Sequence, residues 1–128
     1  MTEPSGGLFS TAADLAKFYQ MILSGGVWQG KRIVSEAAIA EMTKPHRAGG
    51  KLLNYGLGWM CNNPEKANVP GFSDHAYGHG GAFATHGWVD PARRVVTVLL
   101  VQNVLVKGGN LRKALHDPVL AAYSARKN

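Results

Sequence analysis

A histidine set among glycines is the feature of this 128-residue sequence best suited to chemistry. It lies in the run YGHGGAFATHGWVD, from Tyr77 to Asp90, which is soon followed by the apolar stretch RVVTVLLVQN. Glycines on both sides of His79 leave almost no side chain there, so a ligand or another backbone can approach the main chain closely. We therefore expect an edge strand that presents its own N–H groups to a substrate.

Four pieces of the sequence, taken in order, resemble a known enzyme family: SGGLFSTAADLAKFYQMILSGG, YGLGW, GHGGAFATHGWVDP and VVTVLLVQN. They are similar to the C-terminal half of the β-lactamase-related serine hydrolases, which include class C β-lactamases, penicillin-binding-protein-like DD-peptidases and esterases. The resemblance extends from Ser5 to Asn103. Complete members are far longer, so it implies that residues 1–128 form a single partial domain, the C-terminal half of such a hydrolase.

The resemblance implies acyl transfer, in which a serine attacks a carbonyl and two backbone N–H groups stabilise the oxyanion. The family uses an SxxK motif with the nucleophile, a YxN or SxN element, and a KTG-like triad on a core strand. On that match His79, Gly80 and Gly81 form the triad, and Ala82 supplies the second oxyanion N–H. His79 would replace the lysine and donate a hydrogen bond near the substrate. Alternatively, it is merely a histidine at a glycine bend.

The other two motifs are not convincing in this sequence. A literal SxxK occurs at Ser124–Lys127, but it lies at the chain end, where helices fray, whereas an activated serine needs a rigid, buried helix start. No tyrosine is followed two residues later by asparagine, and Ser73-Asp74-His75 only superficially resembles SxN. We expect the isolated chain to be inactive because it lacks the nucleophile.

Two functions therefore remain open. The intact enzyme would hydrolyse a small-molecule or peptide acyl substrate, namely a β-lactam, a D-amino-acyl peptide or an ester. The alternative is a non-catalytic module that keeps part of the fold for oligomerisation or binding. In either case the sheet would lack its other half and expose an apolar surface or a bare edge. We expect self-association or association with the missing N-terminal half.

Composition argues against several other classes. With 45% hydrophobic and 17% charged residues the chain is globular, and no apolar run approaches the roughly 20 residues that cross a bilayer. The formal charge of +6 is spread through loops and both ends, so neither a nucleic-acid nor a membrane partner is expected. Cys61 is the single cysteine and leaves the compartment open, either cytoplasmic or periplasmic/secreted. His75 and His79 lack a third ligand, so we expect no metal and no cofactor.

Helix signals dominate the first part of the chain. Ser10 or Thr11 can cap a helix that ends at Gly25 and Gly26 and whose apolar residues recur at helical spacing: Leu15, Phe18, Tyr19, Ile22 and Leu23. The turn pair Gln29–Gly30 predicts a small hairpin. Ser35 can cap a second, short helix that reaches about Met42. A loop should follow, from Lys44 to Asn54.

The remainder predicts an α+β fold, a three-stranded antiparallel sheet with flanking helices that forms part of a β-lactamase/transpeptidase-like fold. The strands are expected at Tyr55–Met60, Gly80–Val89 and Arg94–Gln102, the last being a central strand covered on both faces. A final helical segment is interrupted at Asp117–Pro118, which we interpret as a new cap with proline at the first helical position. Of the other histidines, we expect His86 to be structural, and His46 and His116 to face solvent.

Overall fold

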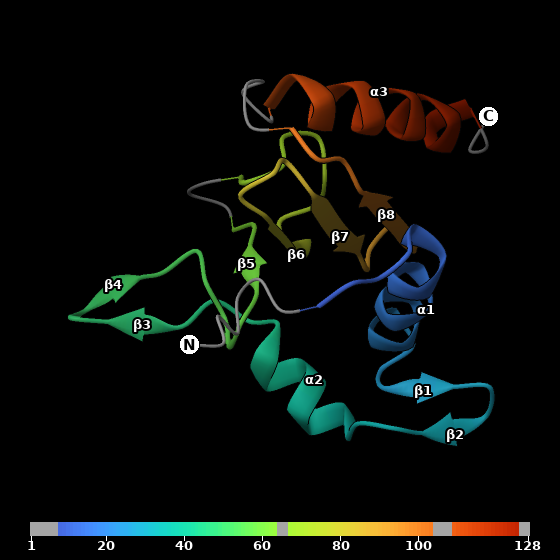
Figure 1. The fold of residues 1–128 in the computed structure, drawn as a ribbon. Helices are drawn as coiled ribbons and strands as arrows, with labels where there is room; N and C mark the ends of the chain where they lie inside the picture. Colours follow the sequence, from blue (N-terminus) through green and yellow to red (C-terminus); the bar gives the residue numbers. More distant parts are fainter. Residues whose placement is uncertain (1–7, 64–66, 104–108, 126–128) are drawn as a thin grey trace, which may run out of the picture.

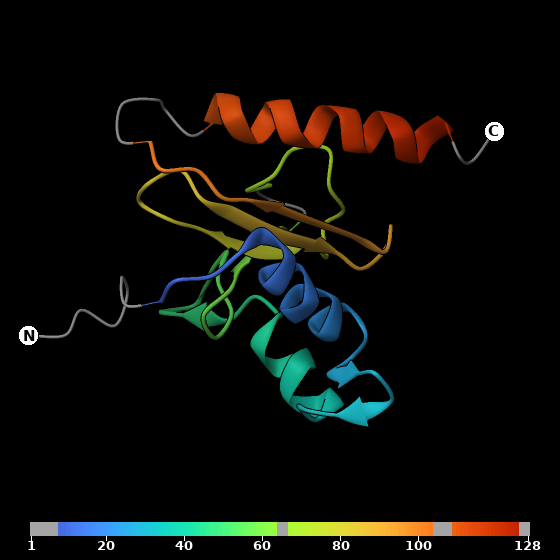
Figure 2. The same ribbon diagram turned by 45° about the vertical axis from the view of Figure 1, so that its right-hand side comes forward.

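The computed structural model describes residues 8–63, 67–103 and 109–125. Its main feature is an antiparallel sheet with the strand order β5-β6-β7-β8 (Figure 1). The strands are β5 (Met60–Cys61), β6 (Tyr77–Gly80), β7 (His86–Asp90) and β8 (Val95–Leu99). Figure 2 shows α3 (Gly109–Ala125) along one face of the sheet and α1 (Ala12–Leu23) against the other. The predicted α+β class, with an antiparallel sheet and flanking helices, is confirmed.

The sheet has four strands among the described residues, not three, because the strand expected from Gly80 to Val89 is in fact a hairpin. The chain turns between β6 and β7, where the Gly81 N–H donates to the Thr85 carbonyl oxygen at 2.9 Å. Ala84 has a φ of 67° in this turn, a conformation that non-glycine residues adopt only rarely. No standard turn pair marks the position, so the sequence pattern did not reveal it.

The YGLGW segment forms a turn, and of the strand expected at Tyr55–Met60 only Met60 lies in a strand. The Gly56 N–H donates to the Trp59 carbonyl oxygen at 2.7 Å, and Gly58 has a φ of 80°. A Cβ at Gly56 would overlap the carbonyl oxygen of Met42, so only glycine fits there. The large–small alternation therefore reflects a tight turn and a close backbone approach, not a pleated strand.

Both predicted helix starts are present. Thr11 caps α1 and its hydroxyl accepts from the Asp14 N–H at 3.1 Å. Ser35 caps α2 (Glu36–Met42) and accepts from the Ala38 N–H at 3.2 Å. These caps satisfy backbone donors that the first turn of a helix leaves without partners.

Two small hairpins extend from this core. β1 (Val27–Trp28) pairs with β2 (Lys31–Arg32), as the Gln29–Gly30 turn predicted. The expected loop contains a second hairpin, of β3 (Arg47–Ala48) and β4 (Lys51–Leu52). Its turn is Gly49–Gly50, and both glycines have positive φ, as such two-residue turns require.

The last helix is continuous, so the interpretation of Asp117–Pro118 as a new helix start is wrong. α3 continues through Pro118, which is exposed. Proline removes one hydrogen bond of the helix backbone. Packing of the residues before and after Pro118 stabilises the helix. His116 is buried, and Leu120 packs against the cluster of Val69, Phe72, Ala76 and Trp88.

β8 is covered on both faces, as expected, because α1 and α3 both contact it. It is nevertheless an edge strand, since among the described strands only β7 pairs with it. A second cluster fills the α1 side of the sheet and consists of Met21, Ile22, Ile39, Trp59, Cys61, Tyr77 and Val89. In the described ranges, none of the helices has the length and apolar character needed to cross a bilayer.

Candidate active site

The HGG triad lies where β6 ends. His79 and Gly80 are its last residues, and Gly81 follows directly. β5 pairs only with Tyr77 and Gly78, so no strand of the described chain pairs with the outer edge of His79 and Gly80. This is the kind of edge to which an extended peptide can add as a strand.

The triad lines an open groove of about 710 Å³. Its walls come from the segment before α1, from α1 itself, from the β6–β7 turn and β7, and from the segment after β8: Leu8, Phe9, Ser10, Leu15, Tyr19, Phe83, Thr85, His86, Gly87, Leu100, Val101 and Gln102. Several wall residues are apolar and in contact with solvent, with Leu8 94% and Phe9 100% exposed. The groove is therefore open to solvent, and its rim is apolar.

Ala82 follows the triad in the β6–β7 turn and is exposed. The neighbouring N–H groups are used within the turn: Gly81 donates to Thr85 at 2.9 Å and Ala84 donates to the Gly81 carbonyl oxygen at 3.1 Å. Within the described residues the Ala82 N–H has no acceptor. Ala82 lies directly after the triad, and its role as an oxyanion donor stays a prediction.

The imidazole of His79 is held at both nitrogens. Nδ1 lies 2.6 Å from the Gly80 carbonyl oxygen, and Nε2 lies 2.6 Å from the hydroxyl oxygen of Tyr55. The Tyr55 and His79 rings meet edge to face at 5.7 Å. The sequence analysis did not identify Tyr55 as a site residue. The available signal was its position directly before the glycine turn of YGLGW.

The glycines around the triad are closely packed within the chain, and Gly78 lies against backbone. A Cβ at Gly78 would overlap the Gly87 carbonyl oxygen, and one at Gly81 would overlap the Thr85 hydroxyl. A Cβ at Gly80 would lie 3.0 Å from the Arg112 guanidinium of α3. The protein itself thus fills much of the space that the glycine pattern indicated as room for a ligand.

A buried histidine pair adjoins the groove, and one of its members, His86, belongs to the groove wall. His86 is 3% exposed, as expected of a structural residue, but His116 is only 4% exposed, so its predicted place in solvent is wrong. Their ring centroids are 4.9 Å apart, and His116 Nε2 lies 3.3 Å from the Thr97 hydroxyl oxygen. Burial, with the charges of His116 and Arg112, lowers the pKa of His86 to about 3. Burial, together with Arg112, also lowers the pKa of His116, so both rings are neutral near pH 7.

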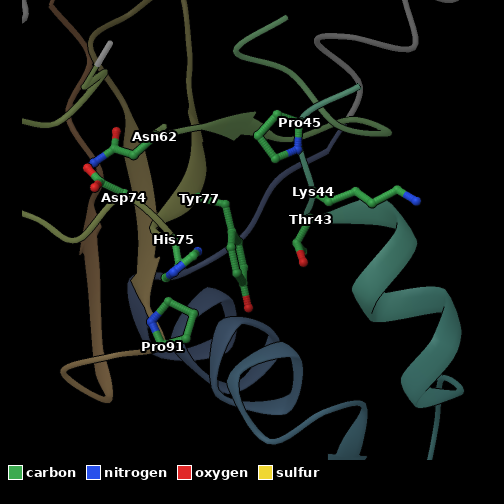
Figure 3. A pocket seen from close by; sticks show the side chains of 8 residues that line it. All are labelled: Thr43, Lys44, Pro45, Asn62, Asp74, His75, Tyr77 and Pro91. Carbon is green, nitrogen blue, oxygen red and sulfur yellow. The ribbon is translucent and has the colours of Figure 1, made fainter. Parts of the chain in front are cut away.

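Another hollow, of about 250 Å³, lies beside the opposite end of β6 (Figure 3). In Figure 3 the Tyr77 phenol stands between His75 and Pro91 on one side and Thr43 on the other. Burial, with a smaller effect from Cys61, raises the pKa of Tyr77 to about 12, so this phenol is no base at neutral pH. Among the residues that the structure describes, no group of three His, Cys, Asp or Glu side chains could hold a metal ion.

The SxxK at the chain end is only partly described. Ser124 is an exposed residue in the last turn of α3, and its hydroxyl donates to the Leu120 carbonyl oxygen at 3.0 Å. Lys127 lies outside the described residues.

Comparison with known proteins gives the family. The family model described as Beta-lactamase matches residues 1–117 of the chain. This chain belongs to the beta-lactamase family. The resemblance inferred from its four sequence pieces is therefore confirmed.

Relatives of this beta-lactamase-family chain include a protein named "Putative D-alanyl-D-alanine carboxypeptidase" from Salmonella gallinarum, 31% identical over 98 residues, which cover 73% of the chain and 22% of that protein. A β-lactamase of known structure from Mycobacterium bovis is 27% identical, with a TM-score of 0.68 over 89% of this chain and 44% of that one. A penicillin-binding protein homologue from Caulobacter crescentus has the same fold, with 24% identity, a TM-score of 0.62 and coverage of 79% and 29% of the two chains. The chain thus spans less than half the length of each.

Proposed function

We propose that this chain supplies the substrate-binding strand of an acyl-transfer site, and that the attacking serine lies on polypeptide outside the 128 residues. One observation carries the proposal: the triad ends β6 at an unpaired sheet edge and lines the groove. The whole enzyme is a serine hydrolase that acts on a β-lactam, a D-amino-acyl peptide or an ester.

In the proposed reaction the serine gives its hydroxyl proton to the lysine of the SxxK motif, which later passes it to the leaving group. The serine Oγ forms a bond to the acyl carbon, and the carbonyl oxygen becomes an oxyanion. The N–H of the serine and the N–H of Ala82 donate to that oxygen. The leaving group departs as the carbonyl reforms, and water then cleaves the acyl-enzyme and regenerates the serine. The backbone edge of His79 and Gly80, which no described strand pairs with, would receive the acyl chain, while His79 takes the place of the family's lysine.

Two surfaces support a missing half as the partner. The groove is rimmed by exposed apolar side chains, among them Leu8, Phe9 and Phe83. At the other side of the sheet, β8 has no strand partner along its outer edge in the described chain. An exposed apolar rim and a long edge strand both favour association. The length of the Mycobacterium and Salmonella relatives points to further polypeptide of the same enzyme as the occupant.

Complementation tests the proposal. The chain alone should hydrolyse neither a chromogenic cephalosporin nor a short-chain nitrophenyl ester. Mixing it with an SxxK-bearing N-terminal half of a relative should restore turnover. His79→Ala should lower that turnover about 10- to 100-fold, as loss of a hydrogen bond to a charged or polarised group does. His75→Ala is the matched control, because His75 is an exposed loop histidine at the other hollow.

The rival function is a non-catalytic module that assembles with copies of itself. Sedimentation measurements of the molecular mass of the chain alone and of the mixture distinguish the two functions. A stable homo-oligomer that does not exchange with the SxxK half, and no turnover in the mixture, would favour the rival.

A further inference from the structure

We propose that Tyr55 is a positioning residue of this site, whose hydroxyl bonds to Nε2 of His79 and holds the orientation of the ring. The inference rests on the proposed function for its role, but the contact that carries it belongs to the chain alone. The Tyr55 hydroxyl oxygen lies 2.6 Å from His79 Nε2, a short and therefore strong hydrogen-bond distance.

The partners of the imidazole determine where its proton lies. The Gly80 carbonyl oxygen, 2.6 Å from Nδ1, can only accept, so Nδ1 carries the hydrogen. In the neutral ring the lone pair is then at Nε2, and Tyr55 must donate to it. Turning the ring over would break both hydrogen bonds. The two hydrogen bonds together therefore select a single tautomer and a single orientation of the His79 ring.

Tyr55 is itself held in place. Its carbonyl oxygen accepts from the His46 N–H at 3.0 Å, and it forms an isolated bridge with Met60 of β5. The next residue, Gly56, lies against the Met42 carbonyl, where a side chain would not fit. The YGLGW turn thus aims a tyrosine at a histidine 24 residues further along the chain.

This arrangement changes which group faces a ligand. With both nitrogens engaged, neutral His79 has no free donor or acceptor, whereas the Tyr55 oxygen keeps acceptor capacity and the residue is 39% exposed. An acyl substrate at this edge would therefore meet the Tyr55 oxygen in place of the imidazole nitrogens.

Nitrogen-15 NMR of the histidine-labelled chain tests the contact without any assay of activity. At a pH where the ring is neutral, we expect the Nδ1–H tautomer and an Nε2 resonance shifted by an accepted hydrogen bond. Tyr55→Phe keeps the ring contact and removes only the hydroxyl, so the Nε2 resonance should shift toward that of an unbonded nitrogen. Tyr123→Phe, which removes a hydroxyl on α3, should leave the His79 signals unchanged.

An Nε2–H tautomer in the native chain, or identical His79 signals in the native and Tyr55→Phe chains, would overturn the inference. Should Tyr55→Phe fail to fold, the Nε2 resonance of the native chain still decides, because an unbonded Nε2 there would overturn the inference. In the complemented enzyme, Tyr55→Phe should lower kcat/KM about tenfold, equivalent to one lost hydrogen bond. If the NMR result is as expected but no mixture is active, the contact stands and the proposed function fails. An active mixture in which Tyr55→Phe is as active as the native chain overturns the positioning role and leaves the function intact.

Discussion

The phenol ring of Tyr19 lies against the backbone of Gly87, in the space that a side chain at position 87 would need. The contact joins α1 to β7, and both residues line the groove beside the triad. Burial raises the pKa of Tyr19, so a neutral phenol fills this space at neutral pH. The helix thereby forms one wall of the proposed site, and the fit between ring and glycine sets its distance from the sheet.

Gly87→Ala should destabilise the fold by about 1–3 kcal/mol, because the new methyl group would overlap the Tyr19 ring. Urea unfolding measures the loss. Gly87→Ala combined with Tyr19→Leu should lose less than the sum of the two single changes, since leucine makes room for the methyl group. Strict additivity would show that the two residues do not share this space.

Asn62→Ala should cost about 2–4 kcal/mol, since the buried amide of Asn62 connects three parts of the following loop. Its oxygen accepts from the Asn68 N–H at 2.8 Å and the Val69 N–H at 3.1 Å, and its nitrogen donates to the Val69 and Ser73 carbonyl oxygens at 3.2 and 3.0 Å. Removing the amide leaves these groups without partners. Thermal unfolding measures the cost, and a loss below about 1 kcal/mol would contradict this account of the loop.

Acid should destabilise the chain through its buried histidines. The pKa of His86 is about 3 in the fold, against an ordinary value near 6.5 in the unfolded chain, so the unfolded state binds more protons between these values. The free energy of unfolding should therefore fall as the pH is lowered from about 6.5 towards 3, by up to a few kcal/mol. His86→Phe keeps the stacked ring but removes the titration, and should flatten this slope in urea unfolding at pH 7 and 4.5. An unchanged slope would exclude His86 as its source.

Pro118→Ala should stabilise the chain by about 1–3 kcal/mol, because Pro118 is exposed inside α3 and removes a backbone hydrogen bond there. A proline at the first position of a separate helix would behave in the opposite way, since there it favours the helix. A lower melting temperature for Pro118→Ala would therefore support two helices in place of one.

Local signals in the sequence were enough to predict the secondary structure of the first third of the chain. The Thr11 and Ser35 caps and the Gln29–Gly30 turn act within a few residues of themselves, and α1, α2 and the β1–β2 hairpin follow them. The HGG triad was not placed correctly, since the sequence indicated the start of a strand at Gly80, whereas His79 and Gly80 end β6 and a turn follows.

What could not be predicted depends on contacts distant in sequence. His116 is buried because α3 lies along the sheet, and Pro118 is tolerated within a helix for the same reason. The YGLGW turn is shaped by the Met42 carbonyl, which belongs to α2. Tyr55 became visible as a site residue only when the turn and β6 were seen together, since 24 residues separate it from His79.

If this chain carries the strand side of an acyl-transfer site, the nucleophile lies on other polypeptide. Intact mass spectrometry tests this after an acylating β-lactam or phosphonate ester is added to the chain mixed with an SxxK-bearing half. We expect a covalent adduct on the added half, formed only when this chain is present and slowed by His79→Ala. An adduct on this chain that disappears in Ser124→Ala would contradict it, because the attacking serine would then be its own.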